Sequence, residues 1–257
     1  MKNKLHNNKI KIIFLGTNGW YDTNTGNTIS ILIDTPSEYV VLDAGNGIYK
    51  LDQYIKDKNK PIYLFLSHFH LDHIAGLHIL AKFKFKQGIN ICVQKGGKKL
   101  INQLIRQPFT LAIKDLKTKV KIIELSQKYL SIAFLEKVLF LHHVSPCIGF
   151  RFNFFGKIIS YIPDTGLCKN AYELAANADL VIAECAFKAG QNNNSWPHLN
   201  PITAAKLARD SKAKKLALVH FDAEIYQNIS DRKKSQTIAN KIFKHSYAMI
   251  DNQIIKV

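Results

Sequence analysis

A buried strand that runs into a cluster of histidines places the strongest restriction on how this chain can fold. The apolar segment 61–66 leads directly into Ser67-His68-Phe69-His70-Leu71-Asp72-His73. Side chains alternate faces along an extended segment, so His68, His70 and Asp72 are predicted to point the same way, and a helix starting next would turn His73 inward. Such a loop can serve two adjacent metal ions. The competing interpretation is a set of ordinary surface histidines, because the chain has ten.

Three further candidate ligands stand where predicted strands end. His143 closes the apolar segment 138–141, Asp164 follows the segment 157–162, and His220 closes the segment 215–219. Each one alone would be unremarkable. Together with the histidine loop they supply two nitrogen-rich sites and one carboxylate that is free to bridge them.

Composition predicts a globular protein of moderate size. The chain has 257 residues, of which 47% are hydrophobic, enough for a sizeable core. Its four cysteines lie far apart without a Cys-x-x-Cys pair, which argues against a disulfide framework or a zinc knuckle. No apolar segment has the length of a signal peptide core or a membrane span. We therefore expect a cytoplasmic protein that does not contact a membrane.

The net charge of +17 requires a strongly positive surface, which attracts phosphates and leaves nucleic acid open as a partner. The alternative is compositional drift, since Lys, Asn and Ile are abundant together. The Gly-rich turn at 95–99 lacks the spacing of a phosphate-binding P-loop.

The order of elements predicts an α/β (α+β) protein with two sheets packed face to face, helices outside, and a single domain over 1–257. No Ser/Gly/Pro-rich linker separates the two halves. The predicted helices are 47–58, 74–84, 95–106, 170–176, 200–211 and 232–244. The predicted strands are 9–15, 29–34, 39–43, 61–66, 89–94, 120–125, 129–135, 138–143, 148–155, 157–162, 179–183, 216–219 and 247–257.

With these residues in view, the sequence resembles the metallo-β-lactamase fold superfamily, within it the phosphodiesterase branch that includes ribonuclease Z. The likeness extends from Leu15-Gly16-Thr17 to His220, and its most specific part is the His-x-His-x-Asp-His loop. It implies a four-layer αββα sandwich. It also implies one metal held by His68, His70 and His143, a second held by Asp72, His73 and His220, and Asp164 as the bridge.

The resemblance also assigns residues outside the ligand set. His143 is preferred to His142 because Gly149-Phe150-Arg151 follows at the spacing of the Gly-Tyr-Arg in ribonuclease Z. The segment 196–205 is similar to the family segment with a non-ligand histidine ahead of an Ala-Ala helix. That makes His198 a proton donor, and the cap residue Asn200 with Pro201 would hold its loop rigid. Glu184 is its acidic partner by the same pattern, or a solvated turn carboxylate.

Asp43 stands at a strand end in Val41-Leu42-Asp43-Ala44-Gly45, where it either orients the neighbouring ligand loop or simply forms a turn. His78 lies on the predicted helix 74–84 and is expected at the surface. Imidazole and carboxylate ligands without thiolate suit two zinc ions, with manganese as the alternative. In this scheme Asp72 both ligates and orients the hydroxide that the two metals share.

The substrate is less constrained. Ribonuclease Z proteins carry a long arm between the Gly-Tyr-Arg strand and the bridging aspartate, where this chain has only 152–162. The family pattern Pro-x-Lys-x-Arg-Asn is replaced by Thr23-Asn24-Thr25-Gly26-Asn27. We therefore expect a phosphodiesterase for a small or nucleotide-type phosphodiester. Ribonuclease Z activity is the runner-up, followed by thioester or lactone hydrolysis as in glyoxalase II and by non-catalytic nucleic-acid binding. A homodimer is left open.

Overall fold

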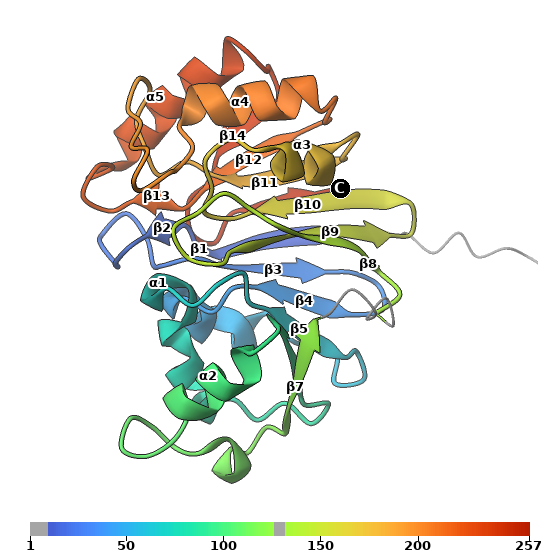
Figure 1. Cartoon of the computed structure of the whole chain (residues 1–257). Helices are drawn as coiled ribbons and strands as arrows, with labels where there is room; N and C mark the ends of the chain where they lie inside the picture. Colours follow the sequence, from blue (N-terminus) through green and yellow to red (C-terminus); the bar gives the residue numbers. More distant parts are fainter. Residues whose placement is uncertain (1–9, 126–131) are drawn as a thin grey trace, which may run out of the picture.

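The computed structural model describes residues 10–125 and 132–257, and it consists of two large sheets packed face to face between two layers of helices (Figure 1). Seven strands form the first sheet, in the order β15-β1-β3-β4-β5-β6-β7. They are β15 (Ile254–Lys256), β1 (Lys11–Gly16), β3 (Ser30–Asp34), β4 (Tyr39–Leu42), β5 (Ile62–Phe65), β6 (Ile89–Gln94) and β7 (Val120–Leu125).

Six strands form the second sheet, in the order β14-β12-β11-β10-β9-β8. They are β14 (Ser246–Ala248), β12 (Leu216–Val219), β11 (Leu180–Glu184), β10 (Lys157–Ile162), β9 (Ile148–Phe154) and β8 (Leu135–Phe140). A two-stranded sheet joins β2 (Asn18–Gly19) to β13 (Phe221–Asp222). It ties the N-terminal loop to the segment that follows β12.

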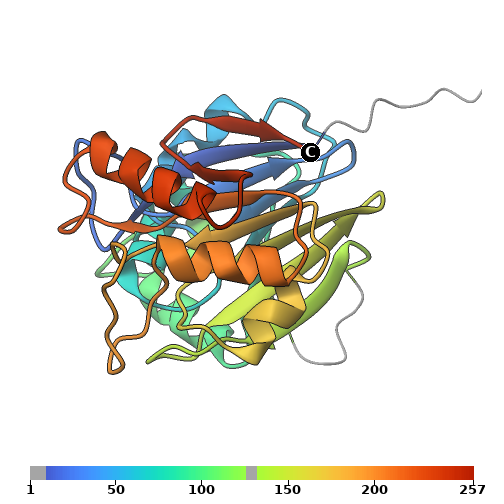
Figure 2. The ribbon, with the colours of Figure 1, turned by 90° about the horizontal axis from the view of Figure 1, so that it is seen from above.

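The helices cover the outer faces of both sheets, as Figure 2 shows for the second sheet from above. Beside the first sheet lie α1 (Leu71–Ile74), α2 (Gly97–Leu104) and the 3₁₀ helices η1 (Asn46–Gln53), η2 (Ala75–Lys82) and η3 (Ile113–Asp115). Beside the second sheet lie α3 (Lys169–Ala175), α4 (Pro201–Asp210) and α5 (Ile229–Asn240). The four-layer αββα arrangement predicted from the sequence is therefore confirmed.

Three layers of apolar side chains hold these four layers together. The central one packs Phe65 of β5 against Phe150 and Phe152 of β9, with ring centroids 5.1 to 5.2 Å apart. The two outer cores lie between each sheet and its helices. The central strands of both sheets are thus buried on both faces, which explains why they read as nearly continuous apolar runs.

Two groups of parallel strands end beside one another. β4 and β5 run parallel in the first sheet, and β10, β11 and β12 run parallel in the second. Parallel strands present their carboxyl ends at the same edge. The residues at or just after these ends include the polar side chains singled out in the sequence, namely Asp43, His68, Asp164, Glu184 and His220.

Several predicted elements are wrong in extent. The single strand β8 replaces the predicted strands 129–135 and 138–143. The chain forms a turn at Ala133 and Phe134, so β8 begins only at Leu135. Residues 129–131 of the first predicted strand lie outside the described part. The predicted last strand 247–257 is two strands in different sheets. They are separated by a turn in which Asn252 adopts a φ of 67°.

The helical predictions also need correction at their ends. In place of the predicted helix 47–58 the structure has a shorter 3₁₀ helix, η1. In place of the predicted helix 74–84 it has α1, which begins earlier, at Leu71, followed beyond Ile74 by the 3₁₀ helix η2. The predicted helix 232–244 is α5, which starts three residues sooner because Asn228 caps it by accepting from the Asp231 amide. Among the described residues, no helix combines the length and apolar character required to cross a bilayer.

Candidate metal centre and active site

The loop after β5 positions the first group of histidines. Both the backbone amide and the hydroxyl of Ser67 donate to the Asp43 carboxylate, at 2.7 and 2.8 Å, which fixes the start of the loop. The chain then turns into α1, where the His73 amide donates to the His70 carbonyl at 3.0 Å. Asp72 is thus placed by a helical turn and not by the extended segment predicted for it, whereas His73 lies on a helix that turns it inward, as predicted.

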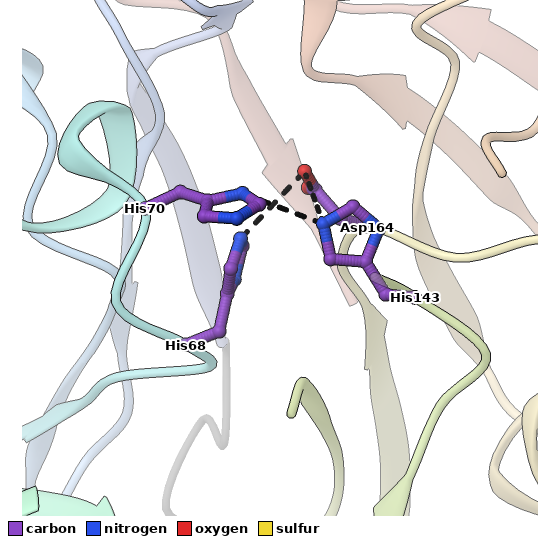
Figure 3. Close-up of side chains that lie close together, drawn as sticks. All are labelled: His68, His70, His143 and Asp164. Atoms are coloured by element: carbon purple, nitrogen blue, oxygen red, sulfur yellow. Dashed lines mark hydrogen bonds and ion pairs between the residues drawn. The ribbon is translucent and has the colours of Figure 1, made fainter. Parts of the chain in front are cut away.

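One cluster combines residues from three separate segments. His68, His70, His143 and Asp164 each offer a ligand atom, and these atoms all lie within 4.8 Å of one another. Figure 3 shows the three rings and the carboxylate pointing towards a common centre. His143 Nε2 lies 3.4 Å from His70 Nδ1, while the neighbouring His142 pairs through its backbone with Gly166.

A second cluster lies beside the first. Asp72, His73 and His220 also bring their ligand atoms within 4.8 Å of one another. The Nε2 atoms of His73 and His220 are 3.0 Å apart, and His220 Nε2 lies 3.1 Å from Asp72 Oδ2. An overlapping group of the same kind joins Asp164, His198 and His220.

Asp164 faces both clusters with different oxygens. Its Oδ2 lies 3.8 Å from His68 Nε2 and 3.9 Å from His143 Nε2. Its Oδ1 lies 3.2 Å from His73 Nε2 and 3.3 Å from His220 Nε2. The carboxylate therefore stands between two groups of nitrogen atoms, as a bridging ligand must.

Hydrogen bonds behind the rings decide which nitrogen faces the clusters. His68 Nδ1 lies 3.0 Å from the Ser67 hydroxyl, and His73 Nδ1 lies 2.8 Å from Asp43 Oδ2, so both rings present Nε2. His70 is reversed, because Ser145 contacts its Nε2 at 3.0 Å and leaves Nδ1 facing inward. Orienting contacts of this kind are typical of metal-binding histidines.

Buried polar atoms without a protein partner indicate that this donor set suits a cation. His68 Nε2 and Asp164 Oδ1 are fully buried and make no hydrogen bond. An unpaired buried polar atom is costly, so such atoms usually have a partner that is not a protein group. Two adjoining groups of nitrogen and carboxylate ligands fit a pair of divalent ions.

The electrostatics of the first cluster favour the same kind of occupant. Burial, reinforced by His73, holds the pKa of His68 well below its usual value, and burial also lowers the pKa of His143. Burial alone would raise the pKa of the Asp164 carboxyl, but His220 and His73 hold it well below its usual range. Neutral imidazoles and an ionised carboxylate are the protonation states that bind divalent metals.

Asp43 is the centre of a buried hydrogen-bond network that includes the candidate ligand His73, so it does not occupy a free turn. Besides Ser67 and His73, the Tyr161 hydroxyl donates to its Oδ2 at 2.7 Å. Asp43 adopts a φ of 56°, a strained conformation that such residues accept where surrounding contacts impose it. Tyr161 was not predicted as part of this network, because nothing in the sequence distinguishes it from the neighbouring apolar residues of β10.

His198 and Glu184 form a buried pair beside the clusters. Glu184 Oε1 lies 2.7 Å from His198 Nδ1 and also accepts from the Thr165 amide at 2.8 Å, so Glu184 is not a solvated turn residue. Burial by itself would lower the pKa of His198, but the Glu184 carboxylate outweighs it and raises that pKa to about 9. The predicted cap of α4 is confirmed, since Asn200 accepts from the amides of Ile202 and Thr203.

A cavity of about 450 Å³ opens above these residues. It is lined by Gly19, Trp20, His70, Asp72, Asp164, Ala186, Trp196, His198, His220 and Asp222.

One contact in this cavity has no signal in the sequence, because the backbone makes it: the Trp20 amide donates to Asp72 Oδ2 at 2.8 Å. His78 is exposed on η2, away from this group, as expected.

Comparison with known proteins agrees with this description. Residues 38–221 match the model of the beta-lactamase superfamily domain. The chain is 24% identical over 241 residues to the probable metallo-hydrolase YhfI of Bacillus subtilis, covering 90% of this chain and 94% of YhfI. It is also 24% identical over 270 residues to a ribonuclease Z of Staphylococcus epidermidis, covering 82% and 88% of the two chains.

Solved structures share the fold. Crystalline YhfI from Bacillus subtilis superposes with a TM-score of 0.80 at 21% identity over 97% of this chain and 100% of YhfI. The short form of human tRNase Z superposes with a TM-score of 0.71 at 21% identity, covering 95% of this chain and 98% of the tRNase Z chain. A diphosphatase of the PhnP family superposes with a TM-score of 0.72 at 12% identity, covering 96% of this chain and 98% of the diphosphatase. The chain therefore belongs to the beta-lactamase superfamily and is a metal-dependent hydrolase with the metallo-β-lactamase fold.

Proposed function

We propose that this protein is a dinuclear metal-dependent phosphodiesterase acting on a small or nucleotide-type phosphodiester. The observation that carries the proposal is the placement of Asp164, whose two oxygens face separate groups of histidines. His68, His70 and His143 would hold one ion, and Asp72, His73 and His220 the other. The ligand types favour zinc, with manganese as the alternative.

A pair of cations held there would lower the pKa of a water molecule and offset the negative charge of a phosphodiester. The protein itself contributes orientation and a proton. Asp72 Oδ2, held by the Trp20 amide at 2.8 Å, has a fixed direction and is suited to orient the attacking water. Because its Nδ1 faces Glu184, His198 can present Nε2 to the cavity and protonate the departing oxygen.

The raised pKa of His198, about 9, supports this role, because the imidazole then carries a proton at neutral pH. A phosphodiester with an alkoxide leaving group needs such a donor, whereas a thioester releases a far weaker base. The pairing of His198 with Glu184 therefore favours hydrolysis of a phosphodiester over hydrolysis of a thioester.

The runner-up is ribonuclease Z activity, which is favoured by the sequence similarity to a ribonuclease Z. Against it, β9 and β10 are joined directly by a turn at Phe155 and Gly156, so no long arm stands between Arg151 and Asp164. A small substrate fits this compact site better than precursor tRNA does.

One substrate panel tests the proposal. Metal-loaded protein is assayed with bis(p-nitrophenyl) phosphate, cyclic nucleotides, precursor tRNA and a thioester. We expect cleavage of the phosphodiesters and no tRNA trimming. Accurate removal of a tRNA 3′ trailer would select the runner-up, and thioester turnover without phosphodiester cleavage would refute both.

Two expectations from the sequence stay predictions, a single domain over 1–257 and a cytoplasmic location, and a homodimer stays open. The free state of Cys92, Cys147, Cys168 and Cys185 supports a reducing compartment. Gel filtration with light scattering would measure the oligomeric state.

A further inference from the structure

Both tryptophans of the chain line the catalytic cavity, and both are exposed. Trp20 is 60% accessible and Trp196 is 47% accessible. Tryptophan is on average highly buried, so two exposed indoles in one concave site point to a ligand that covers them. The metal-centred reaction itself gives no reason for aromatic surface at this place.

Trp196 is held against the candidate ligands. Its ring stacks on His70 with a centroid distance of 5.5 Å and an interplanar angle of 8°, and it meets the His143 ring edge-on at 5.8 Å. The Asn193 side chain accepts from the amides of Ser195 and Trp196, which fixes the approach of the backbone. One face of the indole is thus occupied by His70, and the exposed part remains available to a ligand.

Trp20 is fixed through its backbone. It adopts a φ of 72° and donates its amide to Asp72. The loop that carries it is tied down by the buried Arg232, whose guanidinium donates to the hydroxyls of Thr17 and Thr25 at 2.8 and 3.0 Å. Because the backbone that carries Trp20 is already ordered, a ligand that contacts its indole need not order this loop on binding.

We infer that the site takes a phosphodiester bearing a nucleobase, and that the base stacks on Trp196 with Trp20 lining the same pocket. This inference rests on the proposed function for the phosphodiester part only. The cavity of about 450 Å³ has the size of a small-molecule site, and it contains Asp72, Asp164 and His198 beside both indoles. A base on Trp196 therefore lies close to the phosphate that would react.

The first experiment measures base binding without catalysis. The fluorescence of the metal-loaded protein is titrated with adenosine, which carries no phosphodiester to be cleaved, and, as the control, with ribose. In a Trp20→Phe variant all tryptophan emission comes from Trp196. We expect adenosine to quench this emission and ribose to leave it unchanged; equal emission with saturating adenosine would overturn the inference.

The second experiment uses the metal-loaded enzyme and two esters with the same leaving group, thymidine 5′-p-nitrophenyl phosphate and methyl p-nitrophenyl phosphate. In Trp196→Leu, loss of a base stack should raise KM for the nucleotide ester about 5- to 150-fold more than KM for the methyl ester, because any effect of the lost contact with His70 is common to both esters. Trp196→Tyr keeps an aromatic ring, so its KM for the nucleotide ester should return most of the way to that of the unchanged protein. Phe109→Leu, which removes another exposed aromatic ring outside the cavity, should change neither KM.

The two experiments separate the inference from the proposed function. Quenching by adenosine with no hydrolysis of either ester would refute the phosphodiesterase and keep the base site. Hydrolysis of both esters with identical KM changes in Trp196→Leu would keep the enzyme and refute the base site. A further titration with a short single-stranded oligonucleotide identifies the source of the base. If the oligonucleotide binds no more tightly than adenosine, the ligand is a small molecule. If it binds much more tightly, the ligand is the end of a nucleic acid.

Discussion

Asp43 Oδ2 and His73 Nδ1 lie 2.8 Å apart, and both side chains are fully inaccessible to solvent. The same carboxylate accepts from Ser67 and Tyr161, so it organises the ligand loop and joins the two sheets. This contact is the physical link between the core and the candidate metal centre. It predicts that a change at Asp43 acts on metal affinity and folding together.

Asp43→Asn should lower metal affinity about 10- to 100-fold, because His73 loses its charged orienting partner. Asparagine also tolerates the positive φ at this position, so the backbone should stay in place. Competition with a chelator measures the affinity. Tyr161→Phe is the matched control, since it removes one hydrogen bond, costs about 1 kcal/mol of stability and should leave the affinity near normal.

His68→Ala and Asp164→Asn should differ in how many ions they lose. His68 belongs to one cluster, so its variant should retain the ion of the other, whereas Asp164 faces both clusters and its variant should lose occupancy in both. Elemental analysis of purified protein gives the ratio of metal to chain. The exposed His78 is the control, and His78→Ala should keep full occupancy; full occupancy in His68→Ala and Asp164→Asn would contradict the ligand assignment.

His198→Ala should lower kcat about 10²- to 10⁴-fold on esters with an alkoxide leaving group, the usual contribution of a general acid. The effect should be small on p-nitrophenyl esters, whose leaving group needs no proton. Metal content should not change. A variant that is equally impaired on both kinds of ester would show that His198 has another role.

Glu184→Gln should move the alkaline limb of the kcat profile to lower pH. A general acid works while protonated, so kcat falls as pH rises through its pKa, and Glu184 raises that pKa to about 9. Removing the negative charge destabilises the imidazolium and lowers the pKa. The measurement is a pH profile of both enzymes with saturating alkoxide ester; an unmoved alkaline limb would exclude His198 as the titrating group.

Gly19→Ala should disturb the second cluster selectively. A Cβ at this position would lie 2.5 Å from His220 Cε1 and 2.9 Å from its Nε2, closer than side-chain atoms can approach, so the ring must move. We expect loss of the ion near Asp72 and His220, with the other ion retained, measured by metal stoichiometry. Gly156→Ala is the control: its φ of 82° makes alanine strained in the turn between β9 and β10, but the new Cβ meets no atom within 4 Å, so stability should fall while both ions are kept.

Local patterns in the sequence account for most of the layers. Apolar runs such as that of β5 predict strands because a sheet buried on both faces needs apolar side chains at successive positions. The errors fall where local pattern is weak: β14 and β15 read as one strand, although they pair with β12 and β1 in different sheets. Pairing depends on distant partners, which a local pattern does not contain.

The sequence by itself determined that His68, His70, Asp72 and His73 lie close together as candidate ligands, because they follow one another within six residues of the chain. Only the tertiary structure decided that Asp164 faces both histidine groups and that Trp196 stacks on His70, since these contacts join segments brought together by two packed sheets. The physical reason is that covalent spacing restricts near neighbours alone. Contacts between distant strand ends depend on the burial of apolar surface that packs the two sheets.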